Sequence, residues 1–148
     1  MEQLDTLDFS DIKTSGFLGA FAFDELPRLT KKKWSVIVNT APKSDEGEHW
    51  IAIVRKGDKT YFMDSYGRKL SFSETTFSFE FVSKLKNKLI GPIVNNPLML
   101  QRLTSNACGY YAMYFVERLS VDNLKNTLKP FSSDLKKNDM YVYKYCKS

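Results

Sequence analysis

One cysteine lies where the sequence changes from a loop to an apolar helix. Cys108 opens a stretch in which apolar side chains recur at the spacing of one helix face, at Tyr111, Ala112, Phe115, Val116 and Leu119. Charge enters only at Glu117-Arg118, so we expect a helix buried in a core, with Ser105 or Asn106 as its cap. Backbone N–H groups and the dipole at a helix start favour an anion, and the thiolate is the nucleophilic form of cysteine. The alternative is a buried cysteine that only packs, which is the commoner role.

A thiol nucleophile needs a base, a group that orients the base, and donors for the oxyanion that forms on the attacked carbonyl. The chain offers His49, its only histidine, as the base, Asp64 as the orienting acid and Gln101 as an oxyanion donor. We expect strands over residues 49–54 and 60–66, and antiparallel pairing would bring His49 and Asp64 to the same end of a hairpin. Alone, a strand-edge histidine and one acid of 17 are more often structural.

Other segments surround these residues with further strands and helices. We expect the first strand of the sheet at Trp34–Asn39, after a glycine-containing apolar segment and a helical turn that stops near Pro27. Apolar residues at every fourth position predict an amphipathic helix over Ser73–Leu89, and Ile93-Val94 predicts a brief strand. The remaining expectations are a helix or loop packed by Phe9 and Ile12, short helices at 122–128 and 132–137 divided by Pro130 with Ser132 or Ser133 as a cap, and a tail at 140–146 that forms an edge strand or a last helical turn.

Composition limits the class of protein. With 148 residues, 43% of them hydrophobic, the chain can build one core, so we expect a single domain over 1–148. Two cysteines without zinc-type spacing predict neither a disulfide framework nor a metal site, and they suit a reducing compartment. No apolar run is long enough to span a bilayer and the acidic start is unlike a signal peptide, so we expect an intracellular protein that is neither secreted nor in a membrane. The net charge of +5 permits nucleic acid as a partner, although the basic residues form no dense tract.

Several segments together resemble the adenovirus maturation protease family. They are Phe17-Leu-Gly, Val36-Ile-Val-Asn-Thr40, Gly47-Glu-His-Trp-Ile-Ala-Ile53, Tyr61-Phe-Met-Asp-Ser-Tyr-Gly67 and the run from Gln101 to Cys108-Gly109. They follow the order of the family and cover residues 17–115, whereas the chain from Leu119 onward carries no such resemblance.

The resemblance implies a role for each candidate. His49 would be the base, Asp64 its orienting acid, Cys108 the nucleophile, and Gln101 an oxyanion donor beside the Cys108 backbone N–H. It also implies an α+β fold of papain-like architecture in permuted order, with a central mixed sheet flanked by helices. The adenoviral enzymes have glutamate where this chain has Asp64, whereas the related SUMO-deconjugating proteases have aspartate. Because aspartate is one methylene shorter, the backbone there must lie closer to His49.

By resemblance, the expected function is a cysteine endopeptidase that cleaves capsid and other precursor proteins of a DNA virus or virus-like mobile element, after a small residue such as glycine. Trp50, which would pack near the histidine, and Gly47 and Asn106 are expected to bind the substrate. Such an enzyme would act as a monomer at the assembly site in the host cell and be packaged in the virion. Its chemistry needs no cofactor, but the family is activated by DNA and by a disulfide-attached peptide, for which Cys146 is no convincing partner.

Two other functions stay open at this point. One is a protease that removes ubiquitin-like modifiers, which Asp64 favours. The other is a catalytically silent domain that binds nucleic acid through its basic residues.

Overall fold

The computed structural model describes residues 8–44, 48–71 and 76–147. Along the chain the elements are η1 (Phe9–Asp11), β1 (Phe17–Ala22), η2 (Phe23–Glu25), β2 (Lys33–Asn39), β3 (Trp50–Lys56), β4 (Lys59–Met63), α2 (Phe79–Lys88), β5 (Ile93–Asn95), α3 (Cys108–Leu119), α4 (Leu124–Leu128) and α5 (Leu135–Lys147). The strands form one five-stranded sheet in the order β1-β2-β3-β4-β5. β1 with β2 and β4 with β5 are parallel pairs, and β2-β3-β4 is an antiparallel meander. The expected class, an α+β fold with a central mixed sheet flanked by helices, is confirmed.

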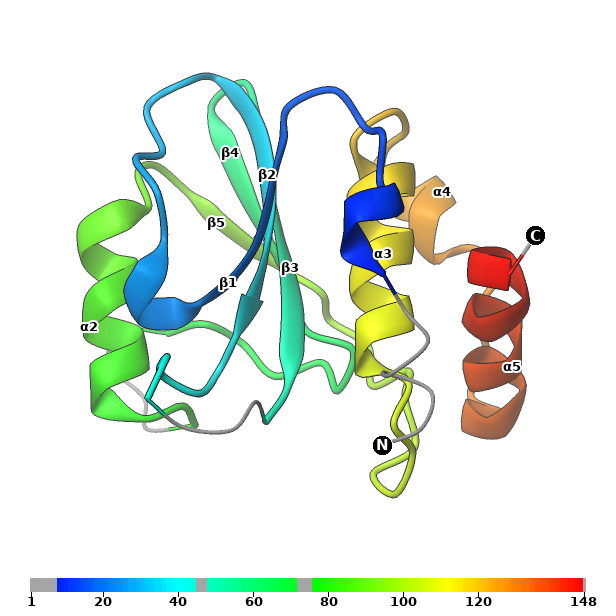
Figure 1. Ribbon diagram of the computed structural model, residues 1–148. Helices are drawn as coiled ribbons and strands as arrows, with labels where there is room; N and C mark the ends of the chain where they lie inside the picture. The colour runs from blue at the N-terminus through cyan, green and yellow to red at the C-terminus, as the bar shows by residue number, and fades with distance from the viewer. Residues whose placement is uncertain (1–7, 45–47, 72–75, 148) are drawn as a thin grey trace.

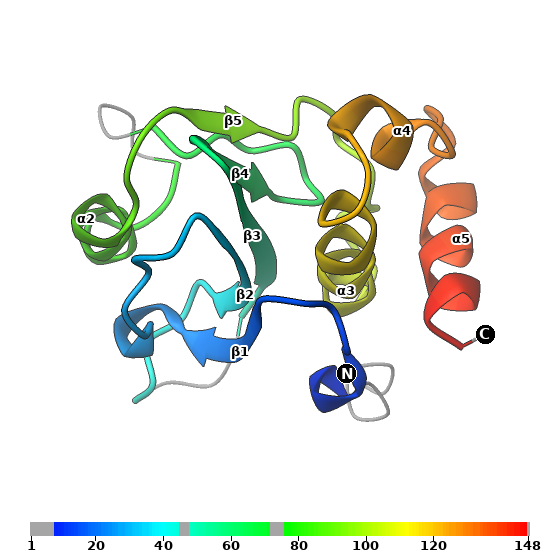
Figure 2. The same ribbon diagram turned by 90° about the horizontal axis from the view of Figure 1, so that it is seen from above.

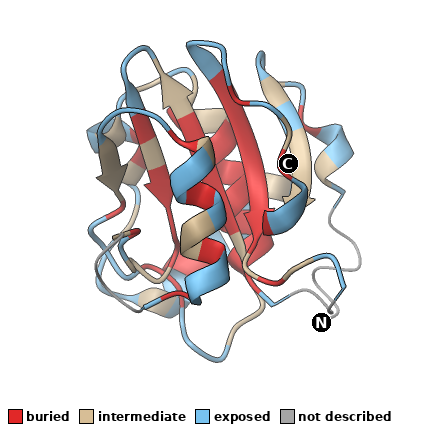
Figure 3. Ribbon diagram, turned by 90° about the vertical axis from the view of Figure 1, so that its left-hand side faces the viewer, coloured by how far each residue is buried: buried red, intermediate tan, exposed pale blue. Residues whose placement is uncertain are grey.

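Helices cover both faces of this sheet (Figures 1 and 2). One face packs on α2 through Phe81 and Leu85, and the other face packs on α3. Strands covered on both faces need apolar side chains at successive positions, which explains the β-branched run Val36-Ile37-Val38, each residue 0% exposed. The central strands are therefore buried along most of their length (Figure 3).

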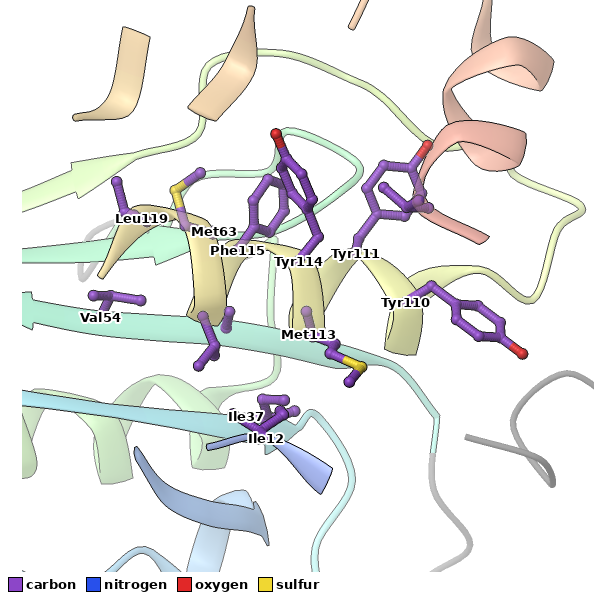
Figure 4. Close-up of a cluster of buried hydrophobic side chains, with 14 of the residues drawn as sticks. Ile12, Ile37, Val54, Met63, Tyr110, Tyr111, Met113, Tyr114, Phe115 and Leu119 are labelled. Carbon is purple, nitrogen blue, oxygen red and sulfur yellow. The ribbon is translucent and has the colours of Figure 1, made fainter. Parts of the chain in front are cut away.

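The helix that begins with Cys108 lies between the sheet and α5 (Figures 1 and 2). Residues 108–116 and Leu119 of α3 are all buried, because side chains on one side of the helix meet strands and those on the other side meet the C-terminal helices. Figure 4 shows this packing around α3, with Val54 and Met63 from the sheet. The phenol of Tyr114 is buried without loss of hydrogen bonding, since it donates to the carbonyl of Thr127 at 2.7 Å.

The N-terminal half of the sheet differs from the expectation. The first strand is Phe17–Ala22, and not the predicted Trp34–Asn39, which is the second strand and begins at Lys33. Gly19, at φ +130°, and a register shift between Phe17 and Ala20 weaken the strand signal in this segment. Of the two alternatives left open around Phe9, the structure has a short helix, η1, and the helical turn expected before Pro27 is confirmed as η2.

The C-terminal half also differs in detail. The predicted helix over Ser73–Leu89 is shorter, because α2 begins at Phe79 with Ser78 as its cap, and residues 73–75 lie outside the described residues. The predicted short helix at 132–137 and the tail are one continuous helix, α5. At its start Asp134, rather than Ser132 or Ser133, accepts a hydrogen bond from the backbone of Lys137.

Candidate active site

A buried histidine and a buried aspartate meet at one end of the β3–β4 hairpin. His49 lies directly before β3 and Asp64 directly after β4, and the antiparallel register, which pairs Ala52 with Met63, brings these flanking residues together. His49 Nε2 and Asp64 Oδ1 are 2.7 Å apart. The residues are 8% and 0% exposed. The sequence therefore predicted the pair and its place correctly. The strand bounds differ, because β3 begins one residue after its predicted start and β4 ends three residues before its predicted end, so that His49 and Asp64 flank the strands.

Asp64 accepts hydrogen bonds at both carboxylate oxygens. Oδ1 accepts from His49 and from the backbone N–H of Tyr66, while Oδ2 accepts from the Arg68 side chain at 2.6 Å and from its backbone N–H at 3.2 Å. Burial alone would raise the pKa of Asp64, but the hydrogen bonds and positive charges of His49 and Arg68 outweigh burial and lower the pKa. Asp64 is thus an anion fixed in one orientation against the imidazole.

Cys108 is the first residue of α3 and is 4% exposed. Burial alone would lower the pKa of His49, but hydrogen bonds to Asp64 and to the Cys108 side chain, together with their negative charges, raise it. The Cys108 side chain is therefore one of the groups whose charge acts on the imidazole. Because Nε2 faces Asp64, Nδ1 is the ring nitrogen left to accept the thiol proton.

The predicted cap of this helix is wrong. Ala107 occupies the N-cap position with helical backbone angles and makes no side-chain cap hydrogen bond. Two residues separate Ser105 from the first residue of the helix, and Ser105 contacts the Gln101 side chain instead. The first backbone N–H groups of α3 have no carbonyl partner within the helix, so they can serve an anion at Cys108.

An aromatic ring covers His49, but it is not the predicted one. Tyr66 stacks on the imidazole with ring centroids 4.8 Å apart and planes at 16°. The Arg68 guanidinium, which donates to Asp64, lies 5.2 Å from the centroid of the Tyr66 ring. Trp50 turns to the α3 face of the sheet, where its ring meets Phe9 edge-on at 5.2 Å. This separation follows from strand geometry, because adjacent residues point to opposite faces.

Gln101 is fully buried and joins the hairpin end to the segment before α3. Its side-chain oxygen accepts a hydrogen bond from the Ser65 hydroxyl at 2.5 Å. Its amide nitrogen donates to the carbonyl oxygen of Ser105 at 3.0 Å and lies 3.2 Å from the Ser105 hydroxyl. The amide is thus fixed near the start of the Cys108 helix, the region where an oxyanion donor is needed.

Two cavities border these residues. One of about 470 Å³ is lined by His49, Tyr66 and Arg68 together with residues of the α2 side. The other, of about 360 Å³, lies between the start of α3 and α5, and Asn106 is part of its wall. Asn106 therefore lines a cavity, and its role as a substrate contact stays a prediction, whereas Gly47 lies outside the described residues.

Three neighbours of the predicted residues were not assigned from the sequence. Ser65, Tyr66 and Arg68 belong to the motif segment that ends at Gly67 or follow it directly, but their side chains gave no signal of their own. The spacing of four residues between Asp64 and Arg68 is one that often brings opposite charges together, and here it does so in a turn.

An imidazole oriented by a buried carboxylate, beside a thiol at a helix start, is an arrangement that can activate a sulfur nucleophile. No protein-family model matches the chain. The chain is 30% identical over 112 residues to the protease of bovine adenovirus 4, an alignment of 70% of this chain and 56% of that protein. It is 24% identical over 158 residues to the protease of bovine adenovirus 7, covering 90% of this chain and 78% of that protein. Both relatives are proteases of adenoviruses, the group of viruses whose maturation protease family the motifs of this chain resemble.

The chain spans little more than half the length of the first of these relatives. Among solved structures, the crystal structure of ASFV pS273R protease and that of its selenomethionine form match with TM-scores of 0.47 and 0.44. Both are 18% identical to this chain, and the matches cover 78% and 76% of this chain and 42% and 43% of those chains.

Two further properties concern the described residues alone. No helix among them is both long and apolar enough to cross a bilayer. They also contain no group of three or more His, Cys, Asp or Glu side chains that could bind a metal ion.

Proposed function

We propose that this chain is a cysteine peptidase with Cys108 as nucleophile, His49 as base and Asp64 as the orienting acid. The observation that carries the proposal is the 2.7 Å contact of His49 with buried Asp64, together with Cys108 at the start of α3, whose side chain helps to raise the pKa of the same imidazole. The bovine adenovirus relatives, both called protease, support peptide bonds as the substrate class.

In the proposed reaction the Cys108 proton passes to Nδ1 of His49 and the sulfur bonds to the substrate carbonyl carbon. The oxyanion accepts hydrogen bonds from the Cys108 backbone N–H and the Gln101 amide. Collapse breaks the C–N bond, and the imidazolium gives its proton to the leaving amine. Water then attacks the thioester, His49 takes the water proton, and the thiol is regenerated with release of a carboxylate product.

The two cavities border the residues next to the proposed nucleophile and could hold substrate. The 470 Å³ cavity borders His49, and the 360 Å³ cavity borders the loop before Cys108. We infer that an extended peptide crosses the site between them. By family resemblance, its source is a precursor protein of the virion, and the enzyme acts in the infected cell and enters the particle.

A cleavage assay tests this function. Viral structural precursor proteins, or a library of peptides with small residues before the scissile bond, are incubated with the full chain and its variants. We expect cleavage by wild type and by Cys146→Ala, and none by Cys108→Ala or His49→Ala. Cleavage by Cys108→Ala would remove the thiol from the mechanism.

One observation favours a second substrate class. The acid beside His49 is aspartate, as in the SUMO-deconjugating proteases that the sequence also resembles. Incubation with conjugates of ubiquitin-like modifiers separates the two, because a deconjugase releases the modifier from a lysine side chain and leaves viral precursors intact.

Activation by DNA or by a peptide stays a prediction from resemblance. Burial raises the pKa of Cys146 to about 12, and this half-buried thiol contacts the carbonyl of Tyr110 at 3.5 Å. It is therefore a poor thiolate for disulfide exchange at neutral pH. We expect that any activating peptide acts without a covalent bond to Cys146, and that addition of DNA is tested by the same cleavage assay at low and high salt.

A further inference from the structure

Ser65 contacts Gln101 at both the side chain and the backbone. Its hydroxyl, in a residue 2% exposed, donates to the Gln101 side-chain oxygen at 2.5 Å. Its carbonyl oxygen accepts from the backbone N–H groups of Leu100 at 2.8 Å and Gln101 at 3.1 Å. One residue of the turn after β4 therefore fixes the whole of Gln101.

The hydrogen bonds also determine which way the Gln101 amide faces. The Ser105 backbone carbonyl, 3.0 Å from the amide nitrogen, can only accept, so it requires an N–H at that position. With the nitrogen placed there, the oxygen must face Ser65, whose hydroxyl satisfies it. Rotation of the amide by half a turn would oppose two carbonyl oxygens at Ser105 and is disfavoured.

The loop that carries Gln101 is attached to the same turn. Fully buried Asn96 donates from its side chain to the carbonyl of Asp64 at 2.7 Å and to that of Leu98 at 2.9 Å. Gly67 ends the turn at φ +75°, and a Cβ there would lie only 2.7 Å from the backbone of Leu98. The turn and the loop are thus in direct backbone contact, with little freedom to slide past each other.

We propose that Ser65 is a positioning residue that orients the Gln101 amide as an oxyanion donor. This inference rests on the function proposed above, because it assigns Gln101 to the transition state of peptide cleavage. Two adjacent residues of one turn then have separate roles, since Asp64 orients the base and Ser65 orients the oxyanion donor. Loss of the Ser65 hydroxyl leaves the buried Gln101 oxygen without this donor, so that the side-chain amide is held only by its contacts with Ser105.

The test compares Ser65→Ala with Ser35→Ala. Ser35 is a matched control, since its hydroxyl is also buried but has no hydrogen-bond partner among the described residues. We expect Ser65→Ala to lower kcat of peptide cleavage by about tenfold or more, up to the loss of about 10²–10³ expected for removal of an oxyanion donor, with KM nearly unchanged. Ser35→Ala should cleave like wild type. In a Gln101→Ala background, Ser65→Ala should cause no further loss.

Alkylation of Cys108 by iodoacetamide separates this inference from the proposed function. The alkylation forms no oxyanion on a carbonyl, so its rate and pH dependence should be the same in Ser65→Ala and wild type. If wild-type Cys108 is not activated toward iodoacetamide, the proposed function and the role of Ser65 both fail. If wild type cleaves and Ser65→Ala cleaves equally well, or if Ser65→Ala costs as much without Gln101 as with it, the role of Ser65 alone is refuted.

A second pair of variants covers the case in which Ser65→Ala does not fold. In Ser65→Thr and Ser65→Val the new side chains have the same shape as each other, but only threonine keeps the hydroxyl. We expect the threonine variant to cleave about tenfold or more faster than the valine variant. Equal rates would overturn the proposal.

Discussion

Replacing Arg68 with glutamine should move the active pH range to higher values. Arg68 and His49 donate to opposite oxygens of the Asp64 carboxylate, over 2.6 Å and 2.7 Å. The guanidinium therefore competes with the imidazolium for one negative charge. Without it, Asp64 stabilises protonated His49 more strongly, and the His49 pKa rises further above its ordinary value.

The size of the shift follows from the separation of the two cationic groups. A shared carboxylate puts their charge centres about 6–7 Å apart, where two unit charges interact by about 0.6 kcal/mol in water and about 2.5 kcal/mol at an effective dielectric constant of about 20. The Arg68 side chain is 35% exposed, so solvent screening places the value toward the lower figure. At about 1.4 kcal/mol per pKa unit, we expect a rise of about 0.5–1 unit.

The assay is the pH dependence of kcat/KM for peptide cleavage. Activity needs the imidazolium paired with the thiolate, and it is lost as pH rises through the pKa at which His49 releases its proton. The alkaline limb should therefore move up by about 0.5–1 pH unit in Arg68→Gln, stay close to wild type in Arg68→Lys, and stay unchanged in Arg118→Gln, whose side chain pairs with Asp122. An alkaline limb that stays in place or moves down in Arg68→Gln would refute the competition for Asp64.

Three further substitutions test other parts of the site and its support. Gln101→Ala should lower the rate of peptide cleavage by about 10²–10³, and an unchanged rate would remove this side chain from the oxyanion hole. Gly67→Ala should lower the unfolding free energy, measured by urea denaturation, by at least about 1–3 kcal/mol, because φ is +75° and the neighbouring backbone occupies the Cβ position. Gly57→Ala, at φ +62° with open space around it, should lose less, and equal losses would show that backbone crowding at Gly67 is unimportant. Tyr111→Phe should cost about 1–3 kcal/mol in the same measurement, since it removes a buried hydroxyl that donates to Asp139 at 2.8 Å, and an unchanged midpoint would contradict this.

The sequence predicted the positions of the candidate site residues better than the contacts that hold them. Periodicity placed Cys108 at a buried helix start, and the turn between two β-branched runs placed His49 and Asp64 at one hairpin end. These features depend on local patterns, which a single sequence records directly. The contacts of Ser65 with Gln101 span 36 positions and depend on the packing of a loop on a turn, which has no periodic signature.

The same distinction explains the misplaced elements. The strand Phe17–Ala22 contains a glycine at positive φ, and its pairing with β2 is parallel and irregular, so local propensity underestimates it. The tail at 140–146 has a tyrosine at every second position, a pattern that suits an edge strand as well as a last helical turn, and packing against α3 favours the helix. Tertiary contacts, and not local preference, fix these segments.

The most direct test of the account is the pH dependence of Cys108 alkylation by iodoacetamide, measured in a Cys146→Ala background with and without His49→Ala. We predict that Cys108 reacts at pH values well below the ordinary thiol pKa of about 8.5, and that this advantage disappears without His49. A Cys108 that titrates as an ordinary thiol, or that keeps its reactivity when His49 is removed, would contradict an activated pair of Cys108 and His49.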